Sequence, residues 1–102
     1  MSVGADQRRN CRTKEYKDRL EKLPDAIKRL ADLAFILFLR DPFAPALHNH
    51  ELEDNKKGRH KSRSRAVSIN LRYRAIYVVD GDVNVWYWVG SHEDYNDFIG
   101  KT

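Results

Sequence analysis

Residues 66–89 read AVSINLRYRAIYVVDGDVNVWYWV. This stretch is rich in Val, Ile, Tyr and Trp, the side chains that pack best on a pleated sheet. It predicts three strands, at 66–70, 73–79 and 83–89. Asp80-Gly81 stands between the last two strands and is typical of a two-residue hairpin turn. The pattern therefore indicates a meander of neighbouring strands.

Side chains of the strand at 83–89 are predicted to alternate between the two faces of the sheet. One face would carry Val83, Val85, Tyr87 and Val89, and the other Asn84, Trp86 and Trp88. Neither face is polar throughout, so both are predicted to be covered. The two tryptophans are predicted to lie in the core, and the alternative is that they stack on exposed nucleobases.

Two helices are predicted upstream of the strands. The first, at 14–23, has apolar side chains at helical spacing between charged ones: Tyr16, Leu20 and Leu23. Pro24 suits the first turn of the second helix, where its missing N–H costs nothing. The second helix ends near Arg40, because the residue before Pro42 is pushed out of helical geometry. Its last two turns are apolar nearly all round, which predicts burial on more than one side.

The rest of the chain is predicted to hold a long loop, a short helix and an edge strand. Residues 42–63 show no sustained period and are predicted to be irregular. Ser91, followed three residues later by Asp94, resembles a capping box, and Gly100 suits the end of the short helix that it begins. An edge strand is predicted near 9–13, and residues 1–11 are otherwise predicted to fray. The predicted class is α+β, as one domain over residues 1–102.

Composition limits the classes of protein. The chain has 102 residues and a formal net charge of +4, with 41% hydrophobic and 33% charged residues, which predicts one soluble globular domain. The longest apolar run, at 33–39, is far shorter than the roughly 20 residues that cross a bilayer, and no secretion signal is apparent. Cys11 is the single cysteine, so an internal disulfide is excluded and a cytoplasmic location is predicted.

Positive charge is concentrated in one block without acidic residues. Its members are Lys56, Lys57, Arg59, Lys61, Arg63, Arg65, Arg72 and Arg74. Such a block attracts polyanions, and each contact to a phosphate adds affinity that falls as salt rises. All of these residues except Arg74 are predicted to bind RNA. The alternative is a solvated loop with no ligand.

Three residues are candidates for catalysis. His92 and Tyr95 share one face of the predicted C-terminal helix near its amino end, where N–H groups favour phosphate and keep an imidazole neutral. Arg74 lies in a strand, where a guanidinium needs an anion or an open groove. If it faces the same groove, the three supply the base, the acid and the cation of metal-free RNA cleavage. Alternatively, Tyr95 packs its ring, His92 sits in a turn, and Arg74 pairs with Asp80 or Glu93.

His48 and His50 are two residues apart, as in some metal sites. The sequence offers no cysteine nearby and no defined third ligand. No metal or other cofactor is therefore predicted.

Several stretches resemble the RelE/ParE toxin superfamily. They are 66–77 (AVSINLRYRAIY), Asp80-Gly81 and 86–95 (WYWVGSHEDY), with upstream parts at 20–24, 40–43 and 47–52. The resemblance covers roughly residues 12–98. It implies two N-terminal helices packed on a small curved antiparallel sheet, followed by a short C-terminal helix.

The resemblance also implies a function. RelE-like members are toxins of type II toxin–antitoxin systems that cut mRNA on the ribosome, arrest translation and are silenced by an antitoxin that wraps them. The expected partners are therefore an antitoxin, the ribosome and mRNA, without a membrane or a small-molecule cofactor. ParE-like members lack the nuclease site and inhibit DNA gyrase, which is the alternative, together with a non-toxic RNA-binding relative.

Site residues follow from the same resemblance. Arg74 falls where the nucleases have a phosphate-binding arginine, and His92 where they have a basic or imidazole side chain. Tyr95 is near their C-terminal aromatic residue, and His50 matches a position that some of them use. Relatives often have an arginine where this chain has Ser68, for which Arg72 or Arg65 would have to substitute.

Overall fold

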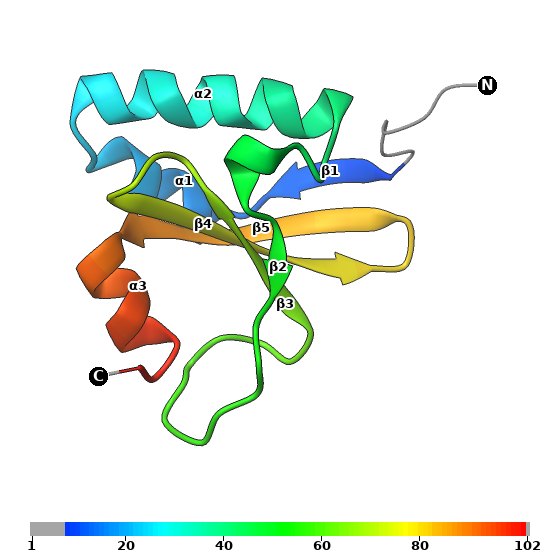
Figure 1. Cartoon of the computed structure of the whole chain (residues 1–102), viewed down its shortest axis with the longest axis vertical. Helices are drawn as coiled ribbons and strands as arrows, with labels where there is room; N and C mark the ends of the chain where they lie inside the picture. Colours follow the sequence, from blue (N-terminus) through cyan, green and yellow to red (C-terminus); the bar gives the residue numbers. More distant parts are fainter. Residues whose placement is uncertain (1–7, 102) are drawn as a thin grey trace.

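The sheet has five strands in the order β1-β5-β4-β3-β2 (Figure 1). The structure is a computed structural model and describes residues 8–101. The strands are β1 (Arg9–Arg12), β2 (His50–Glu51), β3 (Ser64–Ser68), β4 (Tyr73–Asp80) and β5 (Val83–Ser91). β1 pairs with β5 in parallel, whereas the other pairs are antiparallel. The sheet is therefore mixed, and the prediction of a purely antiparallel sheet was wrong at this edge.

The predicted meander is confirmed, with shifted ends. β3 begins at Ser64 rather than at 66, because that part of the chain pairs with β4 and Ser64 is fully buried. The predicted hairpin joins β4 to β5, and Gly81 takes a φ of +62° in its turn. Glycine adopts this backbone conformation without strain. The residues of the turn therefore determine where this hairpin forms.

The helices are α1 (Lys14–Glu21), α2 (Asp25–Arg40) and α3 (His92–Phe98). Thr13 caps α1 by accepting a hydrogen bond from the backbone N–H of Tyr16, and Ser91 caps α3 in the same way from Asp94. The α+β class and both N-terminal helices are confirmed. Residues 42–63 are less irregular than predicted, since they contain a 3₁₀ turn (Pro45–Leu47) and β2. Residues 1–11 were predicted to fray. Residues 1–7 lie outside the described part of the chain, and Arg9–Arg12 form β1.

The sheet separates two hydrophobic cores. α1 and α2 cover one face, and α3 lies against the other (Figure 1). Trp86 lies in the first core, whereas Trp88 lies in the second. The predicted alternation in β5 was wrong here, because Ile76 of β4 pairs with Trp88 but its neighbour Tyr77 pairs with Trp86. Tyr87 is thus an extra residue, and this β-bulge turns the following side chains to the other face.

The outer side of α2 is apolar and uncovered. Its exposed large side chains are Leu30, Leu33, Ile36 and Leu39, and Leu33 is 62% exposed. The prediction that this helix is buried on more than one side was therefore wrong for the chain alone. An exposed apolar stripe of this kind marks an interaction surface. No helix within residues 8–101 is long and apolar enough to cross a membrane.

Tyr16 makes the fold sensitive to alkaline pH. Burial raises the pKa of Tyr16 from 10.0 to about 12. The fold favours the neutral phenol, so this contribution is complete below pH 10 and is lost as pH rises toward 12. We expect the free energy of unfolding to fall by about 2 kcal/mol more in wild type than in Tyr16→Phe over this range. Urea unfolding of both proteins at pH 9 and pH 12 measures the difference, and equal losses would contradict this origin.

Candidate active site

The face of the sheet next to α3 brings together four of the predicted site residues. Arg74 projects from β4 on the side of Ile76, which belongs to the core under α3. Tyr95 comes from α3, and His50 comes from β2 at the edge of the sheet. His92 is the first residue of α3 and follows directly on β5. Residues that are distant in the sequence therefore meet around the phenol of Tyr95.

Tyr95 is the centre of this group. It is only 5% exposed, and its ring packs near that of Trp88, with 6.3 Å between centroids. Burial raises the pKa of the Tyr95 phenol above its usual 10.0, and the positive charge of Arg74 partly offsets this rise. The phenol therefore keeps its proton at neutral pH. It also lies close enough to Arg74 for the positive charge of the guanidinium to act on it.

The orientation of the His50 ring is fixed by a hydrogen bond to a backbone carbonyl group two residues earlier. Its Nδ1 lies 2.7 Å from the carbonyl oxygen of His48. A carbonyl can only accept, so Nδ1 carries the hydrogen and donates it. In the neutral ring, Nε2 then holds the lone pair, and this atom lies 3.5 Å from the hydroxyl of Tyr95. His50 is exposed and thus presents an available base next to a protonated phenol.

Arg74 is half-buried and held by the backbone. Its Nη1 donates to the carbonyl oxygens of Asn70, at 2.6 Å, and of Tyr73, at 3.1 Å. Within residues 8–101 the guanidinium forms no ion pair with a carboxylate, so the alternative pairing with Asp80 or Glu93 is not found. The positive charge is therefore positioned but not neutralised, as binding of a phosphate requires.

His92 stands beside this group with one nitrogen already engaged. The amide Nδ2 of Asn96 lies 3.2 Å from His92 Nε2 and is placed to donate to it. The imidazole ring stacks on that of Tyr95 at 6.4 Å, and the backbone N–H of His92 donates to the carbonyl oxygen of Arg72 at 2.6 Å. The lone pair on His92 Nε2 therefore faces the Asn96 amide.

The basic block does not form one continuous patch. Arg65 lies on the opposite face of the sheet, where its Nε donates to Asn49 Oδ1 at 2.9 Å. Arg59 pairs with Asp97 at 3.0 Å, and Lys61 lies over the ring of Tyr87. The remaining predicted RNA-binding residues are exposed: Lys56, Lys57, Arg63 and Arg72. Arg72 is the member that lies next to Arg74 in the chain.

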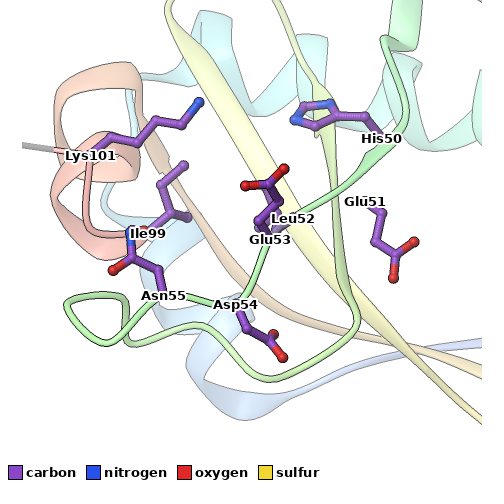
Figure 2. A pocket seen from close by; sticks show the side chains of 8 residues that line it. All are labelled: His50, Glu51, Leu52, Glu53, Asp54, Asn55, Ile99 and Lys101. Atoms are coloured by element: carbon purple, nitrogen blue, oxygen red, sulfur yellow. Dashed lines mark hydrogen bonds between the residues drawn. The ribbon is translucent and has the colours of Figure 1, made fainter.

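His50 also lines a hollow of about 340 Å³ (Figure 2). Its lining residues are His50, Glu51, Leu52, Glu53, Asp54, Asn55, Ile99 and Lys101. The basic residues that predict RNA binding do not point to this hollow, because its lining is mainly acidic and apolar. The run of acids directly before the basic block was the available signal. No group of three metal-ligating side chains occurs within residues 8–101.

Comparisons with known proteins agree with this fold. Residues 48–97 match the family model of the ParE-like toxin domain. No curated protein matches the chain in sequence. The solved toxin–antitoxin complex RelBE2 from Mycobacterium tuberculosis is 20% identical, with 84% of this chain and 92% of that chain covered and a TM-score of 0.61.

Two further solved structures are similar in fold. YafQ from E. coli is 14% identical, with 87% of this chain and 98% of that chain covered and a TM-score of 0.59. A copper-bound mutant toxin from Helicobacter pylori is 20% identical, with 85% and 97% covered and a TM-score of 0.58. The match of residues 48–97 to the ParE-like toxin domain and the shared fold of these toxins agree with the resemblance to the RelE/ParE toxin superfamily.

Proposed function

We propose that this protein is the toxin of a type II toxin–antitoxin system and that it cleaves mRNA on the ribosome in the cytoplasm. The observation that carries the proposal is the position of the Tyr95 hydroxyl, which lies 3.5 Å from His50 Nε2 and close enough to Arg74 to feel its positive charge. A base, an acid and an uncompensated cation on one face are the groups that RNA cleavage by its own 2′-hydroxyl requires.

The proposed reaction assigns one role to each of these groups. His50 Nε2 takes the proton of the 2′-hydroxyl as its oxygen attacks phosphorus. Arg74 stabilises the negative charge that develops on the non-bridging phosphate oxygens. Tyr95 gives its proton to the 5′-oxygen as the P–O5′ bond breaks, since even a phenol with a raised pKa is more acidic than an alcohol. The products are a 2′,3′-cyclic phosphate and a 5′-hydroxyl, and the proton on His50 returns to Tyr95 across their contact.

His92 and the surface cations have supporting roles in this proposal. The ring of His92 stacks on Tyr95 and keeps the phenol oriented. Exposed lysines and arginines of the loop hold the phosphate backbone without reading sequence. The apolar stripe on α2 suits an antitoxin that covers it, and RelBE2 is a toxin–antitoxin complex of similar fold. The second candidate function is a gyrase inhibitor, which the ParE-like family model favours.

Induced expression in a bacterial host separates the two candidates. Pulse labelling of protein synthesis and of DNA synthesis after induction measures which process stops first. A nuclease of translating ribosomes arrests protein synthesis within minutes while DNA synthesis continues. Early arrest of DNA synthesis would favour the gyrase inhibitor. Undisturbed synthesis of both would favour the non-toxic RNA-binding relative.

Replacing His50 and His92 separately by alanine tests the roles proposed for them. We expect His50→Ala to lower the single-turnover rate of mRNA cleavage by about 100-fold or more, because it removes the general base. His92→Ala, the matched control, is expected to lose about tenfold or less, because it removes a stacking contact but no proton acceptor. Cleavage on translating ribosomes measures both. A larger loss for His92→Ala than for His50→Ala would reverse the assignment.

A further inference from the structure

The hollow beside His50 has an apolar floor and a polar rim (Figure 2). Leu52 and Ile99 form the floor, and they are 7% and 4% exposed. Glu53, Lys101 and the ring of His50 point into the same space from three sides (Figure 2). With about 340 Å³, the hollow lies at the small end of ligand pockets, which suits a planar ring system rather than a peptide segment.

Hydrogen bonds within the chain hold the walls of this pocket. Asn55 Nδ2 donates to the carbonyl oxygens of Ile99, at 3.4 Å, and of Gly100, at 3.2 Å, which ties the loop to the end of α3. The carbonyl oxygen of Glu53 lies 2.9 Å from His60 Nε2 and accepts its hydrogen. The backbone that carries the Glu53 carboxylate is therefore held in place by His60.

The pocket adjoins the proposed cleavage site through a shared residue. His50 faces Tyr95 with its Nε2 and also lines the pocket. Because the pocket and the Tyr95 contact share His50, a nucleoside next to a phosphate bound at Arg74 and Tyr95 can reach the pocket. Single-stranded RNA is recognised through bases turned out of the stack and read on their Watson–Crick edges.

We propose that this pocket binds the nucleobase next to the cleaved phosphate and that Glu53 selects guanine. A carboxylate has only acceptors, and guanine offers two adjacent donors, N1–H and the 2-amino group. The Lys101 ammonium is placed to donate to the neighbouring O6. Uracil offers one donor between two carbonyl oxygens, which a carboxylate repels. Glu53 is therefore a specificity-determining residue, and this inference rests on the proposed cleavage of RNA.

Direct binding tests the pocket without requiring cleavage. Guanosine 3′-monophosphate and uridine 3′-monophosphate are the probes, titrated into the full chain while the amide signals of Leu52 and Ile99 are followed by NMR. We expect at least fivefold tighter binding of the guanine nucleotide to wild type, and loss of this preference in Glu53→Gln. Glu21→Gln is the matched control, because this exposed carboxylate belongs to α1, which covers the opposite face of the sheet.

Mapping of cleavage sites on translating ribosomes gives a second readout. Wild type and Glu21→Gln are expected to cut next to guanine more often than Glu53→Gln does. The inference is overturned if RNA is cut but Glu53→Gln keeps the wild-type base preference in both assays. If no RNA is cut but the binding preference depends on Glu53, the proposed nuclease function fails while the pocket stands as a guanine site. Equal binding of the two nucleotides by wild type overturns the pocket assignment.

Discussion

Replacement of Arg74 by alanine is expected to lower the rate of mRNA cleavage by about 100- to 1,000-fold. The reason is that the guanidinium is the one charge held on the proposed reaction face by two backbone carbonyls, with no carboxylate paired to it within residues 8–101. Its effect grows as the phosphate gains charge in the transition state. Lys57→Ala is the control, since this exposed lysine contributes only to general binding of phosphate.

The salt dependence of the activity distinguishes the catalytic role proposed for Arg74 from the general phosphate binding proposed for Lys57. For Lys57→Ala we expect a small loss of binding that shrinks at higher salt, because the contact it removes is itself screened there. For Arg74→Ala the loss should appear in the single-turnover rate at saturating ribosome concentration, and Arg74→Lys should restore only part of it, because a lysine lacks the planar fork. Similar losses for Lys57→Ala and Arg74→Ala would refute the catalytic role of Arg74.

A structural explanation of the Arg74 effect can be tested in the same proteins. Arg74 also holds the turn between β3 and β4 through Asn70 and Tyr73. Loss of these bonds is expected to cost about 1–2 kcal/mol in the free energy of unfolding. A domain of this size, with a stability of roughly 5–15 kcal/mol, stays folded after such a loss. A protein that unfolds completely on this substitution would show that Arg74 is mainly structural.

The largest expected effect on stability belongs to Trp86. It is 2% exposed, and its ring contacts two aromatic side chains of α2, Phe35 and Phe38, as well as Tyr77 of β4. We expect Trp86→Ala to lower the free energy of unfolding by about 3–5 kcal/mol, because it leaves a cavity in the middle of this cluster. Urea unfolding followed by circular dichroism measures the loss.

Two further variants calibrate this result. Trp86→Phe keeps most of the ring but removes the indole N–H that donates to Asn10 Oδ1 at 3.0 Å, so we expect a smaller loss of about 1–2 kcal/mol. Leu71→Ala is the surface control, since Leu71 is 88% exposed and should change stability by less than about 0.5 kcal/mol. If Trp86→Ala lowers the free energy of unfolding no more than Leu71→Ala does, Trp86 is not packed in the core as described here.

The two effects are linked through β5. The bulge at Tyr87 places Trp86 and Trp88 on opposite faces of the sheet. Trp86 packs against α2, and Trp88 packs near the ring of Tyr95. A regular strand would have placed both tryptophans on one side and left Tyr95 without this contact. The core and the proposed site therefore depend on one irregularity of pairing.

Local features of the sequence were sufficient for the helices and the longer strands, but not for β2 or the 3₁₀ turn. The hairpin at Gly81, the cap at Ser91 and the end of α2 near Pro42 follow from backbone preferences of single residues. Helical and strand periods act within a few residues of the chain, so they can be recognised without knowledge of the fold. The resemblance to RelE/ParE toxins then supplied the arrangement of helices on a sheet.

What the local pattern left open was decided by pairing between distant segments. The parallel edge strand β1, the bulge at Tyr87 and the face of Arg65 depend on which strands meet and in which register. The meeting of His50 with Tyr95 depends on the same pairing, because the two residues are 45 positions apart in sequence. Side chains become neighbours only when the sheet forms. The sequence could therefore name candidates for the site, but only the tertiary structure determined their partners.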